Sequence, residues 1–215
     1  MNVMLKSIAA MVLTAGLSGS ALAATTTYAN TPDTTIFYMG YPETTTYGEV
    51  FVAPGGNLQN WSFYLSDGNE GNGKFVITSW DGTKAVGPVL YQQGFSYTPG
   101  ANVPVTFSGI DLELTTGNSY VAYMTVAGAG SPYSGVHAVG SYDDGGLGGY
   151  FAFLNSAGLD PLTQSQTWTS NWSVPFMQFT ADFGDAAAEV PEPASLAIFS
   201  VGLLGLAMRR KALNK

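Results

Sequence analysis

The stretch LQNWSFYL, Leu58 to Leu65, alternates large apolar residues with polar ones. Successive side chains of an extended chain point in opposite directions, so Trp61, Phe63 and Leu65 fall on one side and the residues between them on the other. This period of two is typical of a strand that buries one face in a core. The stretch therefore predicts a β-strand with an aromatic, core-facing side.

The same alternation recurs from residue 24 to about 188, whereas helical periodicity is almost absent. In SYVAYMTVA, Tyr120 and Met124 share one face, and in VPFMQFTADF, Met177, Phe179 and Phe183 share another. Strands are expected at 34–39, 48–53, 58–65, 74–80, 85–92, 103–107, 110–114, 119–127, 135–140, 149–154 and 174–183. Gly, Asn, Asp and Pro cluster between them, as turns require. We predict an all-β, antiparallel β-sandwich of the jelly-roll type.

Charge is scarce and unevenly placed. Between Ala24 and Val190 lie fourteen of the fifteen carboxylates, all except Glu192, against two lysines, Lys74 and Lys84, which gives a formal charge near −12. Such a surface repels phosphate backbones and anionic lipid, so nucleic acid is not an expected partner. The chain has no cysteine, which excludes disulfides, thiolate metal sites and a cysteine nucleophile.

The N-terminus has the pattern of a secretory signal peptide. A single positive charge at Lys6 precedes an apolar run, which ends at the small-residue sequence Ala21-Leu22-Ala23. We predict cleavage before Ala24. A membrane anchor, the alternative, needs a longer apolar run.

The C-terminus has a second apolar segment, 194–208, followed by Arg209-Arg210-Lys211. As a helix of 15 residues it would be about 22 Å long, at about 1.5 Å per residue, against a hydrocarbon core of about 30 Å. It is therefore a short transmembrane helix, whose basic end we place on the cytoplasmic side.

Pro191-Glu192-Pro193, the apolar segment and the basic tail resemble, in this order, the PEP-CTERM sorting signal of Gram-negative bacteria. The resemblance covers Val190 to Lys215. It implies that an exosortase, a membrane-embedded transpeptidase-like enzyme, recognises the Pro-Glu-Pro and removes the helix and tail. It also implies export, tethering of the precursor in the inner membrane, and delivery to the cell surface or an exopolysaccharide matrix.

These signals divide the chain into four parts. The signal peptide takes residues 1–23, the β-sandwich domain 24–184, a short linker 185–189, and the sorting signal 190–215. The middle part, over residues 28 to 183, also resembles a β-sandwich module that recurs among exported PEP-CTERM proteins. This second resemblance supports the fold and implies no activity.

Few residues suggest catalysis. His137 is the only histidine, no G-x-S-x-G elbow occurs, and one imidazole without thiolates cannot complete a typical zinc site. Paired carboxylates of a glycosidase remain an alternative on numbers alone. Most acidic residues, however, stand beside Gly or Asn in expected turns, so we expect no enzyme activity and no obligatory cofactor.

One glycine-rich loop is a candidate for a structural calcium ion. In DGNEGNG, Asp67, Asn69 and Glu70 offer oxygen ligands of the kind that Ca²⁺ prefers, and Asp143-Asp144 forms a second acidic pair. The loop lacks the ligand pattern of an EF-hand. A polar hairpin loop without metal is the alternative.

Aromatic residues are the strongest indication of binding. Four tryptophans and twelve tyrosines are many for a chain with 10% charged residues, and aromatic faces can cover the C–H faces of sugar rings. Trp61 is in register with the core. Trp80, in a Trp-Asp-Gly turn, and Trp168 and Trp172, in a polar stretch, are the candidates for exposure and for contact with a glycan, although core packing is the more common role for each.

We therefore predict an exported, non-enzymatic protein of the surface or extracellular matrix, sorted by exosortase, associated with exopolysaccharide and biofilm, and able to bind a glycan. Two alternatives are a secreted glycan-active hydrolase and a permanently membrane-anchored adhesin.

Overall fold

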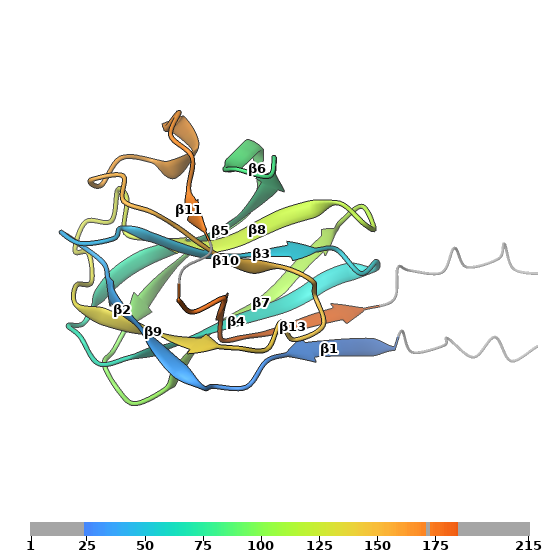
Figure 1. Cartoon of the computed structure of the whole chain (residues 1–215), viewed down its shortest axis with the longest axis horizontal. Coiled ribbons are helices and arrows are strands. Elements are labelled where there is room, and N and C mark those ends of the chain that lie inside the picture. Colours follow the sequence, from blue (N-terminus) through green and yellow to red (C-terminus); the bar gives the residue numbers. More distant parts are fainter. Residues whose placement is uncertain (1–23, 171–172, 185–215) are drawn as a thin grey trace, which may run out of the picture.

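The computed structural model describes residues 24–170 and 173–184, and the predictions made for 1–23, 171–172 and 185–215 lie outside these ranges. The described chain forms a β-sandwich with a single short 3₁₀ turn, Pro161–Thr163 (Figure 1). The strands are β1 (Thr25–Ala29), β2 (Thr34–Met39), β3 (Thr46–Val52), β4 (Asn57–Ser66), β5 (Gly71–Trp80), β6 (Ala85–Tyr97), β7 (Val103–Glu113), β8 (Ser119–Thr125), β9 (Val136–Ser141), β10 (Tyr150–Leu154), β11 (Thr169–Ser170), β12 (Phe176–Met177) and β13 (Phe179–Gly184).

The predicted antiparallel sandwich is confirmed. Strands β2 to β9 form two four-stranded layers with the orders β2-β9-β4-β7 and β3-β8-β5-β6, which is the strand order of a jelly roll. Almost every connection passes from one sheet to the other, so that neighbours in sequence face each other across the core. Strands β10 and β11 extend the second sheet beyond β3, whereas β13, with β1 beyond it, pairs with β4 and β12 pairs with β9.

Strands β1 and β13 bring the two ends of the described chain together. They pair antiparallel, with Thr25 opposite Gly184, and β13 in turn pairs with β4. Both ends therefore leave the sandwich at the same end of the molecule, on the right in Figure 1.

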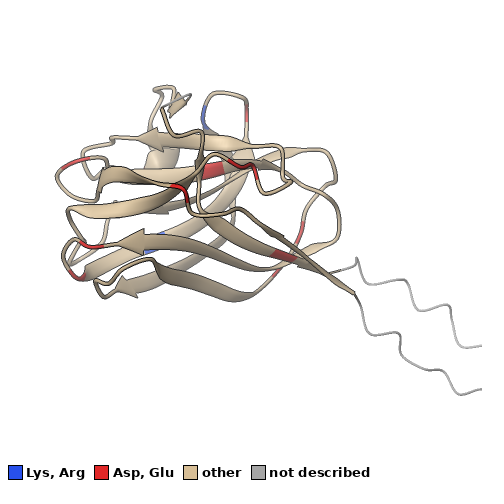
Figure 2. Cartoon of the chain, turned by 60° about the horizontal axis from the view of Figure 1, so that its bottom comes forward, with Lys and Arg blue, Asp and Glu red and all other residues tan. Residues whose placement is uncertain are grey.

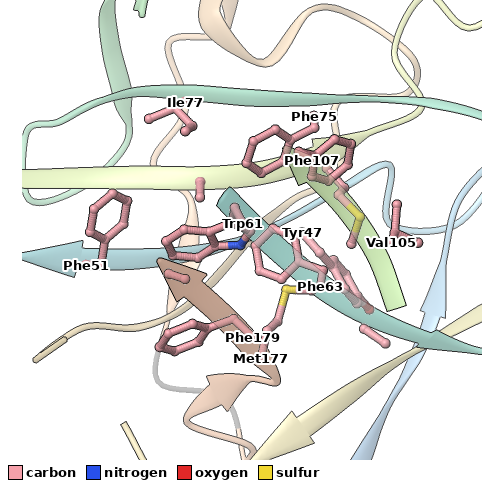
Figure 3. Close-up of a cluster of buried hydrophobic side chains, with 14 of the residues drawn as sticks. Tyr47, Phe51, Trp61, Phe63, Phe75, Ile77, Val105, Phe107, Met177 and Phe179 are labelled. Carbon is pink, nitrogen blue, oxygen red and sulfur yellow. The ribbon is translucent and has the colours of Figure 1, made fainter. Parts of the chain in front are cut away.

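The main core is aromatic and lies between the sheets (Figure 3). The Trp61 ring on β4 stacks on Phe179 of β13 at a centroid distance of 5.2 Å and contacts Phe51 of the opposite sheet at 5.0 Å. Phe75 and Phe107 stack across the two sheets at 4.0 Å. These contacts confirm that the apolar side of LQNWSFYL faces the core.

A second apolar cluster covers the outer face of the six-stranded sheet. Residues 155–168, which we call the cap segment, lie over this face and place Trp168 against Trp80 and Tyr123. Strand β8 is consequently buried on both faces, with Val121 and Tyr123 under the cap segment. The expectation of one buried face is therefore wrong for β8, because the cap segment replaces solvent there.

Several strands differ from the prediction, among them β6, which continues to Tyr97 where the predicted segment ends at 92. Segments 103–107 and 110–114 belong to one strand, β7, which continues through a bulge where Gly109 and Asp111 have positive φ. Segment 174–183 divides into β12 and β13. Strand β1 was not expected, since its exposed sequence TTTYA has no apolar face and is ordered by pairing with β13.

A carboxylate is buried in the main core between the two sheets. Glu49 of β3 lies between Tyr47 and Phe51 in sequence and is 1% exposed. Its Oε2 accepts a hydrogen bond from the Met177 N–H of the opposite sheet at 2.8 Å, whereas its Oε1 has no partner. Burial, and to a lesser extent the nearby Asp144, raises the pKa of Glu49 well above its usual range.

The Glu49 carboxyl makes stability depend on pH. The pKa of Glu49 is higher in the folded chain than in the unfolded chain, where it is about 4.3. The contribution of the protonated carboxyl to the unfolding free energy is therefore complete below about pH 4.3 and is lost as the pH rises through the folded pKa. We expect the unfolding free energy of residues 24–184, measured with urea, to fall between the unfolded and the folded pKa of Glu49. The substitution Glu49→Gln should remove most of this fall. The exposed Glu113→Gln is the control; an equal pH slope in wild type and Glu49→Gln would contradict the prediction.

Candidate functional site

A cleft of about 510 Å³ opens between the β2 edge of one sheet and strands β3 and β10 of the other. We call it the aromatic cleft. Its described lining residues are Thr34, Thr35, Ile36, Phe37, Tyr38, Glu43, Thr44, Tyr47, Tyr142, Phe151, Phe153, Asn155, Ser173 and Val174. The volume lies within the range of about 300–1,000 Å³ that is usual for small-ligand sites.

A bulge in β2 presents two aromatic side chains at this cleft. Ile36 pairs with Ala138 and Met39 with Val136, so β2 has one residue more than β9 over this interval. Ile36 and Met39 are both buried, while Phe37 and Tyr38 are 60% and 57% exposed. Tyr38 has a φ of +58°, a conformation that costs a non-glycine residue roughly 1–3 kcal/mol. Backbone strain of this kind is often found at functional sites.

The loop after β2 is fixed to the sandwich by backbone contacts. Gly40 has a φ of +118° and lies against the backbone of Tyr133, where a Cβ atom would collide. Its N–H donates to the Thr44 carbonyl at 3.0 Å, and the Tyr41 N–H donates to the Tyr133 carbonyl at 3.1 Å. These contacts hold the loop that carries Glu43 at the cleft.

A hydrogen bond connects the two sides of the cleft. The Tyr47 hydroxyl on β3 donates to the Phe37 carbonyl on β2 at 2.5 Å. Burial raises the pKa of Tyr47 to about 12, so this donor keeps its proton at all ordinary pH values. The bulged segment of β2 is thereby tied to the inner part of the opposite sheet.

Two groups of aromatic rings face the cleft. On the sheet that contains β10, Phe151 stacks with Phe153 at 5.6 Å and contacts Tyr47 at 5.0 Å. On the other sheet, Phe37 and Tyr38 both pack edge-on to His137, at 5.2 and 5.7 Å.

Tyr142 completes the exposed rim of the cleft. It is 61% exposed, and its N–H donates to Asp33 Oδ2 at 3.0 Å, which fixes its backbone. The arrangement offers flat ring faces together with hydroxyl, amide and carboxylate groups.

The cleft lies far from the chain ends. Ile36 aligns through Ala138 with Leu65 of β4, and Asn57 at the other end of β4 pairs with Gly184. Eight residues separate Asn57 from Leu65, or about 26 Å at about 3.3 Å per residue. The cleft and the point where both chain ends leave therefore lie toward opposite ends of the sandwich. In Figure 1, β2, which lines the cleft, lies on the left, and β1 and β13 lie to its right.

Trp80 and Trp168, two of the candidates for exposure, are buried instead. They are 8% and 2% exposed, because the cap segment packs their rings together at 5.6 Å. Trp80 Nε1 donates to the Tyr150 hydroxyl at 2.8 Å, while Trp168 Nε1 is buried without a partner. Neither ring offers a free face to a sugar in this conformation. Trp172 lies outside the described residues, one position before Ser173 of the cleft, and its glycan contact stays a prediction.

The calcium candidates lie in the turn between β4 and β5. Asn69 Nδ2 donates to Ser134 Oγ at 3.1 Å, Asp67 Oδ2 is 3.6 Å from His137 Nδ1, and Glu70 is exposed. Within the described residues no three His, Cys, Asp or Glu side chains gather in a way that could hold a metal ion. Calcium binding at this turn stays a prediction.

Sequence reasoning missed the residues that line the cleft. The signal that could have found them is the sequence Ile36-Phe37-Tyr38-Met39, four large residues in a row that break the period-two alternation. Such a run fits a strand with one buried face only if a bulge turns two of the four side chains outward.

Replacement of Trp168 tests whether its role is packing. We expect Trp168→Ala to lower the unfolding free energy of residues 24–184 by about 3–5 kcal/mol, measured with urea, because it removes the centre of the second cluster. Leu159→Ala, in the same cap segment and 59% exposed, should change it by less than about 0.5 kcal/mol. An unchanged stability of Trp168→Ala would show that the ring is not packed as described.

The C-terminal residues 189–211 match the family model of the PEP-CTERM protein-sorting motif, which confirms the resemblance noted for this part of the sequence. No curated protein matches the chain. No helix among the described residues is long and apolar enough to span a bilayer, and the membrane helix expected at 194–208 lies outside them.

Among solved structures, the chain is similar to a chain of infectious bursal disease virus strain Gt, with 12% identity and a TM-score of 0.25 over 97% of this chain and 55% of that one. The VP2 subviral particle of the same virus gives 13% identity and a TM-score of 0.26, over 95% of this chain and 54% of the viral chain. This chain thus spans about half the length of the viral chains. With TM-scores this low, the likeness carries no argument about fold or function.

Proposed function

Because residues 189–211 carry a PEP-CTERM sorting motif, which supports an exported protein sorted by an exosortase, we propose that the sandwich is a non-enzymatic, glycan-binding protein of the cell surface or extracellular matrix. In this proposal it associates with exopolysaccharide and biofilm, and the precursor is held in the inner membrane by its C-terminal helix until processing. The aromatic cleft takes the binding role that was first expected of Trp80 and Trp168.

The exposed rings at the cleft are the observation that carries this proposal. Phe37, Tyr38 and Tyr142 stand more than half exposed around a concave site, although exposing them leaves apolar surface in water. Ring faces flanked by hydroxyl, amide and carboxylate groups suit sugars, which have apolar C–H faces and a polar edge.

The position of the cleft also supports a surface role. Both described chain ends leave from the end of the sandwich opposite the cleft, and the sorting motif begins five residues after Gly184. A sandwich held through its C-terminus therefore directs the cleft away from the point of attachment, where a matrix polymer can reach it.

The small number of carboxylates at the cleft favours binding of a glycan over its hydrolysis. Glycosidases use a pair of acids about 5–10 Å apart. Among the described lining residues, Glu43 is the single carboxylate, and it stands exposed on the rim.

Retention on polysaccharide tests the proposal. We expect the exported protein to be retained on exopolysaccharide from its own host, and Tyr38→Ala and Tyr142→Ala each to weaken retention by about tenfold, since each removes about 1–1.5 kcal/mol of ring contact. Alanine keeps the Cβ atom, and with it the cost of the positive φ at position 38, so this variant removes the ring alone. Leu159→Ala, which loses an exposed apolar side chain of the cap segment, should bind normally.

The same assay includes Trp172→Ala, which should also weaken retention if the prediction for this residue holds. Failure of the wild-type protein to bind any fraction of the native matrix would contradict glycan binding.

Mass spectrometry of the protein outside the cell tests the sorting. We expect the mature chain to lack Arg209, Arg210 and Lys211, because processing at the sorting motif removes everything after the cut. A mature protein that still ends at Lys215 would favour the permanently anchored adhesin.

A further inference from the structure

The inner part of the aromatic cleft has no free side-chain hydrogen-bond donor among its described residues. Its buried lining residues are Ile36, Tyr47, Phe151 and Val174. The Tyr47 hydroxyl already donates to the Phe37 carbonyl, and the other three side chains are hydrocarbon. A sugar hydroxyl placed there would lose its water and find no free donor and at most one acceptor, the Tyr47 oxygen, among these side chains, whereas a methyl group would gain apolar contact.

The rim has the opposite chemistry. Thr34, Thr44, Asn155 and Ser173 place hydroxyl and amide groups at or near the mouth, where the ring hydroxyls of a sugar remain partly in water. The cleft is therefore polar at its mouth and apolar at its floor, and it matches a ligand that has both kinds of surface.

Charge around the cleft disfavours anions. Glu43 lines the rim, and Asp33 lies beside Tyr142 through its hydrogen bond to that residue's N–H. Neither of the two lysines of the described residues, Lys74 and Lys84, lines the cleft. Carboxylates are distributed over the whole sandwich (Figure 2), so the surrounding potential is negative.

From these observations, and resting on the proposed function, we propose that the cleft binds a neutral sugar residue that carries a methyl group, either a 6-deoxy sugar or an acetylated one. The methyl group enters the floor between Ile36 and Val174, the ring lies against the exposed aromatic side chains, and the ring hydroxyls meet the rim. Sugars that carry a carboxylate are rejected.

Titration calorimetry with defined saccharides tests this specificity. The full chain is held in a polyoxyethylene detergent, which contains no sugar. The probes are a rhamnose trisaccharide, an N-acetylglucosamine trisaccharide, a glucose trisaccharide and a galacturonate trisaccharide. We expect at least one methyl-bearing probe to bind about tenfold more tightly than the glucose probe, which is the selectivity that one buried methyl group gives. The galacturonate probe should bind most weakly.

Two variants test the roles of the floor and the rim. Val174→Thr keeps the side-chain shape but places a hydroxyl in the floor, so it should reduce the preference for the methyl-bearing probe to less than about threefold. Glu43→Gln should strengthen binding of the galacturonate probe, because it removes a like charge. Leu159→Ala is the control, and a thermal melt of each variant shows that it is folded.

The outcomes separate this inference from the proposed function. Preference for rhamnose alone, for N-acetylglucosamine alone, or for both supports the inference and identifies the source of the methyl group. Equal affinity for the glucose probe, tighter binding of the galacturonate probe, or no binding of any probe by a protein that native exopolysaccharide still retains overturns the inference and leaves the proposed function intact. Loss of retention on the polysaccharide itself would overturn both.

Discussion

Aromatic packing between the two sheets is the contact on which the rest of this structure depends. Trp61 and Phe107 on one sheet meet Phe51 and Phe75 on the other. The chain has no disulfide to replace them, because it has no cysteine. An exported domain of this kind must be held by apolar burial and by strand pairing alone. The close stacking of these rings also fixes the distance between the sheets, and so determines where the sandwich is closed and where it opens.

The opening of the sandwich follows from the same arrangement. Along the β2 edge the sheets part, and the inner rings Tyr47 and Phe151 continue from the core into the aromatic cleft. The cleft is thus an extension of the core to the surface. The β2 bulge then turns Phe37 and Tyr38 outward and anchors Ile36 and Met39 inward, so a single extra residue converts a core-edge strand into the rim of a site.

The sequence alone predicted the sandwich well, because alternation is a local property that a single chain displays. The core faces of LQNWSFYL and VPFMQFTADF needed no tertiary information. The burial of Trp80 and Trp168 could not be predicted in this way, since it depends on a cap segment without periodicity that folds over a distant sheet face. The cleft was missed for a similar reason: its residues come from β2, β3, β10 and the segment before β12, which only the strand order brings together.

We propose that the end of the sandwich remote from the chain ends is its binding surface. Chemical-shift mapping by NMR, with isotope-labelled protein and soluble fragments of the native exopolysaccharide, tests it most directly. We expect the signals of Phe37, Tyr38 and Tyr142 to shift on titration, while those of Trp80 and Trp168 under the cap segment stay in place. Shifts that centre on Trp80 and Trp168, with the cleft residues unmoved, would contradict it.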